Sequence, residues 1–71
     1  MITIEDVKKA WGKYEAYKDQ AEQHEFTMLL VLDMKLVPLY NDLIKNWDED
    51  HAAIFMNFLK YVGEKFGFTL C

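Results

Sequence analysis

Apolar residues recur at intervals of three and four positions through most of this chain. This spacing is typical of amphipathic helices, whereas strands would show alternation. Residues that break helices are few, namely three glycines and the single proline, Pro38. We therefore predict one domain covering 1–71, with helices over about 4–23, 26–46 and 49–66. The expected fold class is all-α, a small three-helix antiparallel bundle in which the second helix is kinked at the proline.

The first segment carries clear helix signals. Thr3 is suited to cap the N-terminus, and Asp6 follows three positions later, which is the spacing of a capping box. The apolar positions cover an arc of roughly 140° on the helical wheel: Ile4, Val7, Ala10, Trp11, Tyr14, Tyr17 and Ala21. Lys18 falls inside this arc, where it could reach solvent or meet an acidic group of a partner. We place the end of this helix near 24–27, where the apolar face changes phase; the alternative is one continuous helix over 3–37.

The second segment is apolar on nearly every side between residues 28 and 37. One face of the wheel carries Leu29, Leu32, Leu36, Leu39, Tyr40, Leu43 and Trp47, and the other carries Leu30, Val31, Met34 and Val37. Asp33 and Lys35 interrupt this stretch, and we expect both to point outward because an unpaired charge is costly in an apolar region. The alternative is that they form an ion pair that fixes register with a partner. Pro38 removes a backbone donor and should kink or split the helix.

The third segment begins and ends with recognisable caps. Asp48 is a good N-cap, and Gly67 stands where a helix commonly ends in a left-handed residue. The apolar positions cover roughly 220° of the wheel, more than one core contact needs. Their centre consists of Phe55, Phe58, Leu59, Val62 and Phe66. The tail 68–71 is short and apolar, and it either packs down or frays.

The apolar content exceeds what so small a chain can bury. Apolar residues make up 52% of the sequence, whereas a domain of about 60 residues buries only roughly 60% of its surface. We therefore expect a homo-oligomer with a shared core, and a homodimer as its commonest form. Methionine and aromatic residues are enriched at protein interfaces. On this basis the predicted interface residues are Met28, Val31, Met34, Ile54, Met56 and Tyr61.

Charge and cysteine content narrow the possible partners. The net charge is −4, and all eight basic residues are lysines. Without arginine, nucleic-acid binding is not expected. No apolar run is long enough for a membrane span, and the N-terminus lacks the pattern of a signal peptide. The one cysteine, Cys71, cannot form an internal disulfide, so we expect a cytoplasmic protein.

Candidate metal ligands are present without the spacing of a known site. Glu15, Asp19 and Glu22 recur along one edge of the first helix, and His51 follows an acidic run. Carboxylates and imidazoles bind divalent metals. No HExxH motif and no acidic stripe on a second helix accompany them, so a solvated face without a metal or other cofactor is the expectation.

The sequence offers no catalytic motif. Serine is absent, no glycine-rich loop could hold a phosphate, and Cys71 has no basic neighbour to activate it. We therefore expect no enzyme, but a small acidic helical protein that oligomerises and binds, regulates or inhibits another protein, like accessory factors of phages and mobile elements. The alternative is a bundle that binds a small ligand or divalent metal between helices or at the subunit interface, with Glu15, Asp19, Glu22 and His51 as the residues to test.

Overall fold

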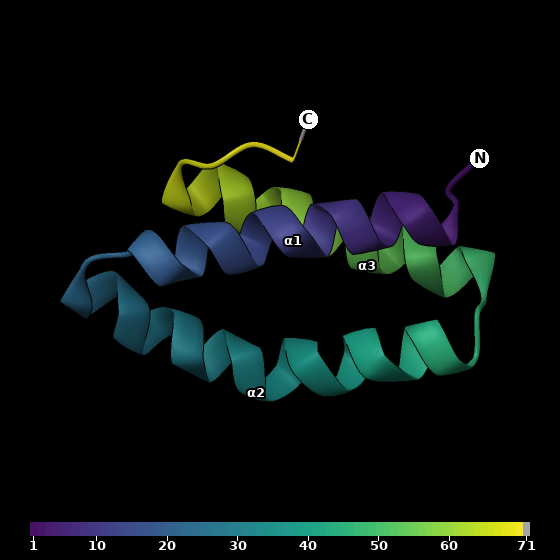
Figure 1. The fold of residues 1–71 in the computed structure, drawn as a ribbon, viewed down its shortest axis with the longest axis horizontal. Coiled ribbons are helices and arrows are strands. Elements are labelled where there is room, and N and C mark those ends of the chain that lie inside the picture. The colour runs from purple at the N-terminus through teal and green to yellow at the C-terminus, as the bar shows by residue number, and fades with distance from the viewer. Residues whose placement is uncertain (71) are drawn as a thin grey trace.

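The computed structural model describes residues 1–70 and contains three helices. They are α1 (Ile4–Gln20), α2 (Gln23–Lys45) and α3 (Glu49–Phe66) (Figure 1). Residues 1–70 form no strand, and the predicted all-α class is confirmed. Successive helices run in opposite directions, and α1 packs more extensively on α3 than on α2.

The three predicted caps are present. Thr3 and Asp6 form a reciprocal capping box, in which each side chain accepts the other's backbone N–H at 3.2 and 3.0 Å. Asp48 accepts the N–H groups of Asp50 and His51 at the start of α3. These backbone hydrogen bonds hold the pKa of both aspartates below its usual value. Gly67 ends α3 with a φ of 93°, the left-handed conformation that glycine adopts without strain.

The break between the first two helices lies earlier than the sequence predicts. α1 ends at Gln20, and Ala21 and Glu22 have extended backbones before α2 begins. The prediction of a break near 24–27 is therefore wrong by a few residues, and the continuous helix over 3–37 does not form. With the break at this position, Ala21 packs against the core. A hydrogen bond from the Tyr17 hydroxyl to Glu25 connects the two helices across the turn.

The core takes a wide face from α1 and α3 but only a narrow stripe from α2. Its buried residues are Val7, Ala10, Trp11 and Tyr14 in α1, Leu29, Leu36 and Leu43 in α2, and Ala52, Phe55, Leu59 and Val62 in α3. The three leucines of α2 are seven residues apart, which is two helical turns, so they form a single seam. Leu39 and Phe58 share their helical-wheel faces with core residues but are 58% and 42% exposed, because they lie to one side of these seams.

Aromatic rings connect all three helices at the middle of the core. The indole of Trp11 in α1 stacks on the ring of Tyr40 in α2, with centroids 4.5 Å apart. It also lies 6.0 Å from the ring of Phe55 in α3 and 5.0 Å from that of Tyr14. Since tilted and stacked pairs at these distances are favourable, Trp11 fixes how the helices sit against one another.

The C-terminal tail packs down onto α1. The ring of Phe68 stacks on Tyr17 at 4.7 Å, and Phe68 and Leu70 both pack against the core. The tail passes so close to α3 that a Cβ added at Gly63 would lie 2.7 Å from the Phe68 carbonyl oxygen. Glycine is thus required there by close approach. Cys71 lies outside the described residues.

Pro38 lies inside α2, which continues through it from Gln23 to Lys45 without a break. The proline therefore does not split the helix, and the kink at this position stays a prediction.

Replacing Pro38 by Ala should raise the free energy of unfolding by about 2 kcal/mol. Proline is about 3 kcal/mol worse than alanine inside a helix, and roughly 1 kcal/mol of this is offset because proline also restricts the unfolded chain. Pro38 is exposed, so no core contact is lost. Urea denaturation of both proteins measures the difference, with Asn41→Ala as a control at another exposed α2 position. An unchanged or lower stability would contradict the expectation.

Candidate functional site

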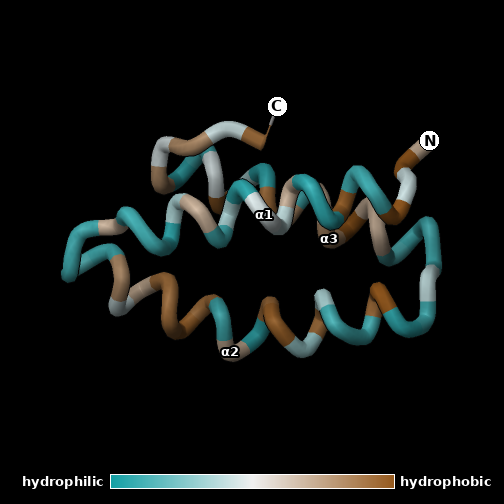
Figure 2. The backbone as a smooth tube through the Cα atoms, viewed as in Figure 1, coloured by the Kyte–Doolittle hydropathy of each residue, from teal (hydrophilic) through white to brown (hydrophobic). Residues whose placement is uncertain are grey.

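Exposed apolar side chains gather on α2 and α3. Figure 2 shows apolar positions recurring on successive turns of α2. The large side chains concerned are Phe26, Met28, Leu30, Val31, Met34, Val37 and Leu39 on α2, and Ile54, Phe58 and Tyr61 on α3. They stay outside because α2 buries only its leucine seam. None of the helices in residues 1–70 combines the length and apolarity needed to cross a membrane.

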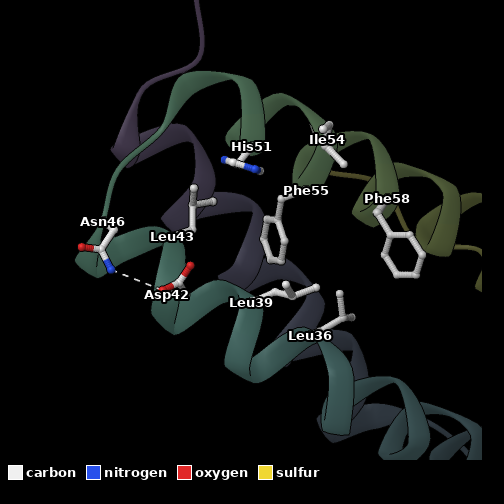
Figure 3. A pocket seen from close by; sticks show the side chains of 9 residues that line it. All are labelled: Leu36, Leu39, Asp42, Leu43, Asn46, His51, Ile54, Phe55 and Phe58. Atoms are coloured by element: carbon white, nitrogen blue, oxygen red, sulfur yellow. Dashed lines mark hydrogen bonds between the residues drawn. The ribbon is translucent and has the colours of Figure 1, made fainter.

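A first hollow of about 340 Å³ lies between the C-terminal half of α2 and the N-terminal half of α3. Its floor is apolar, and Leu39, Ile54 and Phe58 line it (Figure 3). Polar groups line the end nearest the α2–α3 turn, where Asp42 and His51 lie. The Nδ2 of Asn46 donates to the Asp42 carboxylate there at 3.3 Å.

A second hollow of about 310 Å³ lies between the other halves of the same two helices. Met28 and Val31 line it from α2, and Tyr61 and Lys65 line it from α3. Phe58 lines both hollows. The two hollows are therefore adjacent, and we name them together the α2–α3 groove, with Asp42 towards one end and Lys65 towards the other.

Four further apolar residues of α2 line neither hollow. They are Phe26, Leu30, Met34 and Val37, and Met34 is 78% exposed. Their spacings of four, four and three residues place them on one side of the helix. We name them the outer α2 stripe.

The contact between α1 and α2 contains a network of polar side chains from the same chain. The Lys18 Nζ donates to the Asp33 Oδ2 at 2.7 Å and lies 3.1 Å from Glu15, while the Tyr14 hydroxyl donates to the other Asp33 oxygen. The Lys18 and Asp33 side chains are only 15% and 18% exposed. The expectation that Asp33 points outward is therefore wrong, because its charge is paired inside the fold. Lys35 does face solvent.

This network shifts the ionisation of its members. The hydrogen bond to Asp33 raises the pKa of Lys18 by favouring the ammonium form. Burial raises the pKa of Tyr14, and Asp33 raises it further because a phenolate would be repelled by the carboxylate. Lys18 is thus satisfied by groups of its own chain and needs no acidic group from a partner.

A second tyrosine fastens the α1–α2 turn. The Tyr17 hydroxyl donates to the Glu25 carboxylate and lies 3.0 Å from the carbonyl oxygen of Phe66 at the end of α3. The hydrogen bond to Glu25 raises the pKa of Tyr17 to about 12. All three helices therefore meet at this end of the bundle.

The structure does not bring the predicted metal ligands together. Glu15 pairs with Lys18, Asp19 is exposed, and Glu22 lies at the α1–α2 turn. The start of α3 lies at the other end of the molecule from the α1–α2 turn (Figure 1). His51 belongs to this first turn of α3, and its Nδ1 is 3.2 Å from Asp48. These side chains do not form a common site.

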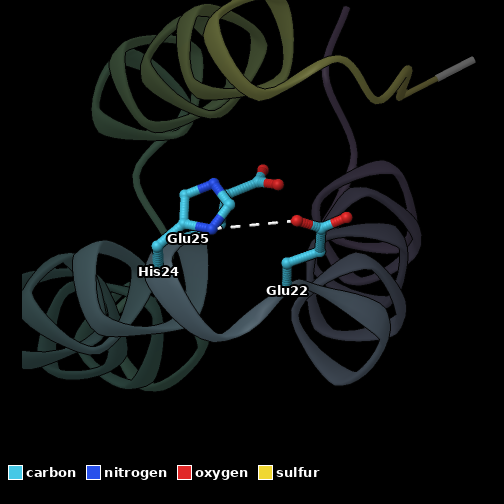
Figure 4. Close-up of side chains that lie close together, drawn as sticks. All are labelled: Glu22, His24 and Glu25. Atoms are coloured by element: carbon cyan, nitrogen blue, oxygen red, sulfur yellow. Dashed lines mark ion pairs between the residues drawn. The ribbon is translucent and has the colours of Figure 1, made fainter.

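One other group of potential ligands is found among residues 1–70. Glu22, His24 and Glu25 each place one ligand atom within 4.8 Å of the others (Figure 4). The His24 Nδ1 is 3.7 Å from the Glu22 carboxylate, and both side chains are about three-quarters exposed. Glu25 already accepts a hydrogen bond from Tyr17. The cluster is fully accounted for by a surface ion pair and this contact.

The six predicted interface residues fall into two groups. Met28, Val31, Met34, Ile54 and Tyr61 are all exposed, and all but Met34 line the α2–α3 groove. Met56 differs, because it is partly buried and packs against the core. Leu39 and Phe58 also line the groove but are not among the six predicted interface residues. The excess width of the apolar faces indicates that some apolar residues remain exposed, but it does not indicate which ones.

Comparison with protein-family models, curated proteins and solved structures finds no match to this chain.

Proposed function

We propose that this protein is a small non-catalytic helical protein that self-associates and binds, and thereby regulates or inhibits, another protein. The observation that carries the proposal is the set of large apolar side chains left at least 36% exposed on α2 and α3. Monomeric proteins rarely leave contiguous apolar surface of this kind uncovered. Association with other chains is the common way to cover it.

Two separate apolar surfaces support two kinds of association. The α2–α3 groove is a concave surface between helices, whereas the outer α2 stripe is a convex ridge on one helix. A ridge of apolar residues at spacings of three and four is a usual contact for a helix or groove of another protein. One surface can therefore serve self-association while the other stays available to a different partner.

The charged groups of the interior support the non-catalytic part of the proposal. Lys18 and Asp33 neutralise each other, and Tyr14 donates to the same carboxylate. Such a closed network fixes the contact between α1 and α2 and leaves neither of the two charges without a partner.

Light scattering and site-specific photo-crosslinking test the proposal together. We expect a solution mass above the 8.5 kDa of one chain. A photo-reactive residue at Met34 should also give a defined adduct with a second protein in cells that naturally make this chain. The control is the same residue at Lys9, an exposed position of α1. A monomer at every concentration, with no more adduct at Met34 than at Lys9, would contradict the proposal.

The first hollow favours a second candidate function, the binding of a small ligand or divalent metal. Its volume of about 340 Å³ falls within the range of small-ligand sites, which combine apolar walls with a few polar groups. Here Asp42, Asn46 and His51 would supply those groups. A thermal-shift screen with divalent metals and nucleotides, using His51→Ala against His24→Ala as the control, tests this candidate. No shift with any compound would exclude it for the compounds screened.

A further inference from the structure

We propose that the occupant of the α2–α3 groove is a second copy of this chain, lying antiparallel to the first about a twofold axis near Phe58. This inference rests on the self-association proposed above, and it specifies the surface, the relative orientation and the contacting charges.

The order of charges along the groove supports a second copy. Asp42 lies towards one end, Lys65 lies towards the other, and the apolar Phe58 is shared by both hollows. A twofold axis through the middle of the groove exchanges its two ends, as an isologous interface requires. Asp42 of each copy then faces Lys65 of the other, so that two opposite-charge contacts form. A parallel arrangement would instead place like charges together.

The chemistry along the groove fits an interface core between polar ends. Leu39, Ile54 and Tyr61 are exposed apolar or aromatic side chains close to Phe58, and the charged residues lie outside them. Stable interfaces show this arrangement, with charge depleted at the centre and enriched at the rim. Two copies of Phe58 would meet at the axis, because residues on a twofold axis contact their own equivalents.

The face is also large enough for a stable dimer. The molecule is 34 Å long. Two helices lying side by side are about 20 Å across, so this face covers roughly 700 Å². That area is close to the roughly 800 Å² that each partner buries in a standard interface.

Charge-reversal variants test the geometry directly. We expect Asp42→Lys alone and Lys65→Glu alone each to weaken dimerisation by about tenfold, since each creates two like-charge contacts per dimer. The double variant should return to within about threefold of the original affinity, because both contacts again join opposite charges. Sedimentation velocity over a dilution series measures the dissociation constants, and circular dichroism confirms that each variant is folded.

Mixing the two single variants gives an independent readout. In a heterodimer of Asp42→Lys and Lys65→Glu, both contacts join opposite charges, so the mixture should dimerise more tightly than either variant alone. Matched controls are Asp19→Lys, an exposed acid of α1, and Lys45→Glu, which changes the last turn of α2 as Lys65→Glu changes that of α3. Neither control residue lines the groove, so neither should alter the dissociation constant.

The possible results separate this inference from the proposed function. A wild-type protein that stays monomeric at every concentration would overturn both the self-association and its geometry. A dimer that both single variants leave unchanged, or that the double variant and the mixture fail to restore, would overturn only the antiparallel groove contact. Association would then use another surface such as the outer α2 stripe, and the groove would be open to a helix of a different protein or to a small ligand.

Discussion

Replacing Trp11 by Ala is expected to lower the free energy of unfolding by about 3–5 kcal/mol, the usual cost of removing a large aromatic side chain from a core. Trp11 is only 8% exposed and contacts an aromatic ring on each of the other two helices, Tyr40 and Phe55. A domain of this length has a total stability of about 4–10 kcal/mol. The variant should therefore be close to unfolding or unfolded at room temperature.

Trp47→Ala is the matched control for this experiment. Trp47 is the other tryptophan of the chain, lies outside the buried core and is 38% exposed. Its replacement should cost about 1 kcal/mol or less. Urea denaturation followed by circular dichroism compares the two variants without relying on either indole as the probe. Equal losses would show that the aromatic contacts at the centre of the bundle do not hold the three helices together.

Replacing Asp33 by Ala is expected to lower the free energy of unfolding by about 2–3 kcal/mol. The change leaves the part-buried Tyr14 hydroxyl without its acceptor and the Lys18 ammonium with Glu15 as its remaining partner. Losing one member of a buried pair costs about 3–5 kcal/mol, and the remaining exposure of both side chains reduces this figure. Lys35→Ala removes an exposed charge two residues along the same helix and should change stability by less than about 0.5 kcal/mol.

Two further measurements identify the network as the cause. The double variant Lys18→Ala and Asp33→Ala should lose less stability than the sum of the two single losses, because the second change no longer leaves an unpaired charge. The pKa of Tyr14 should also fall towards its ordinary value in Asp33→Ala, although burial still raises it. Phenolate absorbance during an alkaline titration reports this change. Additive losses and an unchanged titration would contradict the coupling.

The sign of the alkaline effect follows from the raised tyrosine pKa. Above pH 10.0, the ordinary pKa of tyrosine, the phenol of Tyr14 loses its proton first in the unfolded chain. Stability therefore falls as pH rises through this range, by about 1.4 kcal/mol per pH unit for one such group. Lys18, whose folded pKa is also raised, adds to the same loss as it deprotonates.

Local signals made the three capped helix ends predictable, whereas the break between α1 and α2 and the packing of the helices could not be predicted in this way. The capping box at Thr3, the N-cap at Asp48 and the left-handed Gly67 depend on neighbours within a few residues, so the sequence contains what determines them. Leu39 and Phe58 could not be assigned, because the width of the buried seam on α2 depends on how α1 and α3 approach it. A helical wheel shows only the angular position of a residue.

The ion pair of Lys18 and Asp33 was not predicted, because a helical wheel does not show which residues of two different helices meet. Each residue is a charge out of place, Lys18 on the apolar face of α1 and Asp33 in the apolar stretch of α2. Their opposite signs are a signal that they could meet, and the structure places them 2.7 Å apart. Two opposite charges that both lie in apolar segments of the sequence therefore indicate an ion pair between them.

The preference of α1 for α3 has a consequence for how the cell makes this protein. Ribosomes add about 5–20 residues per second, so α1 and α2 emerge seconds before the helix on which α1 packs most extensively. The ring of Phe68, which stacks on Tyr17, follows α3 in the chain. The nascent chain therefore presents uncovered leucine and methionine side chains until α3 has been made. Binding by chaperones in that interval would protect it from aggregation.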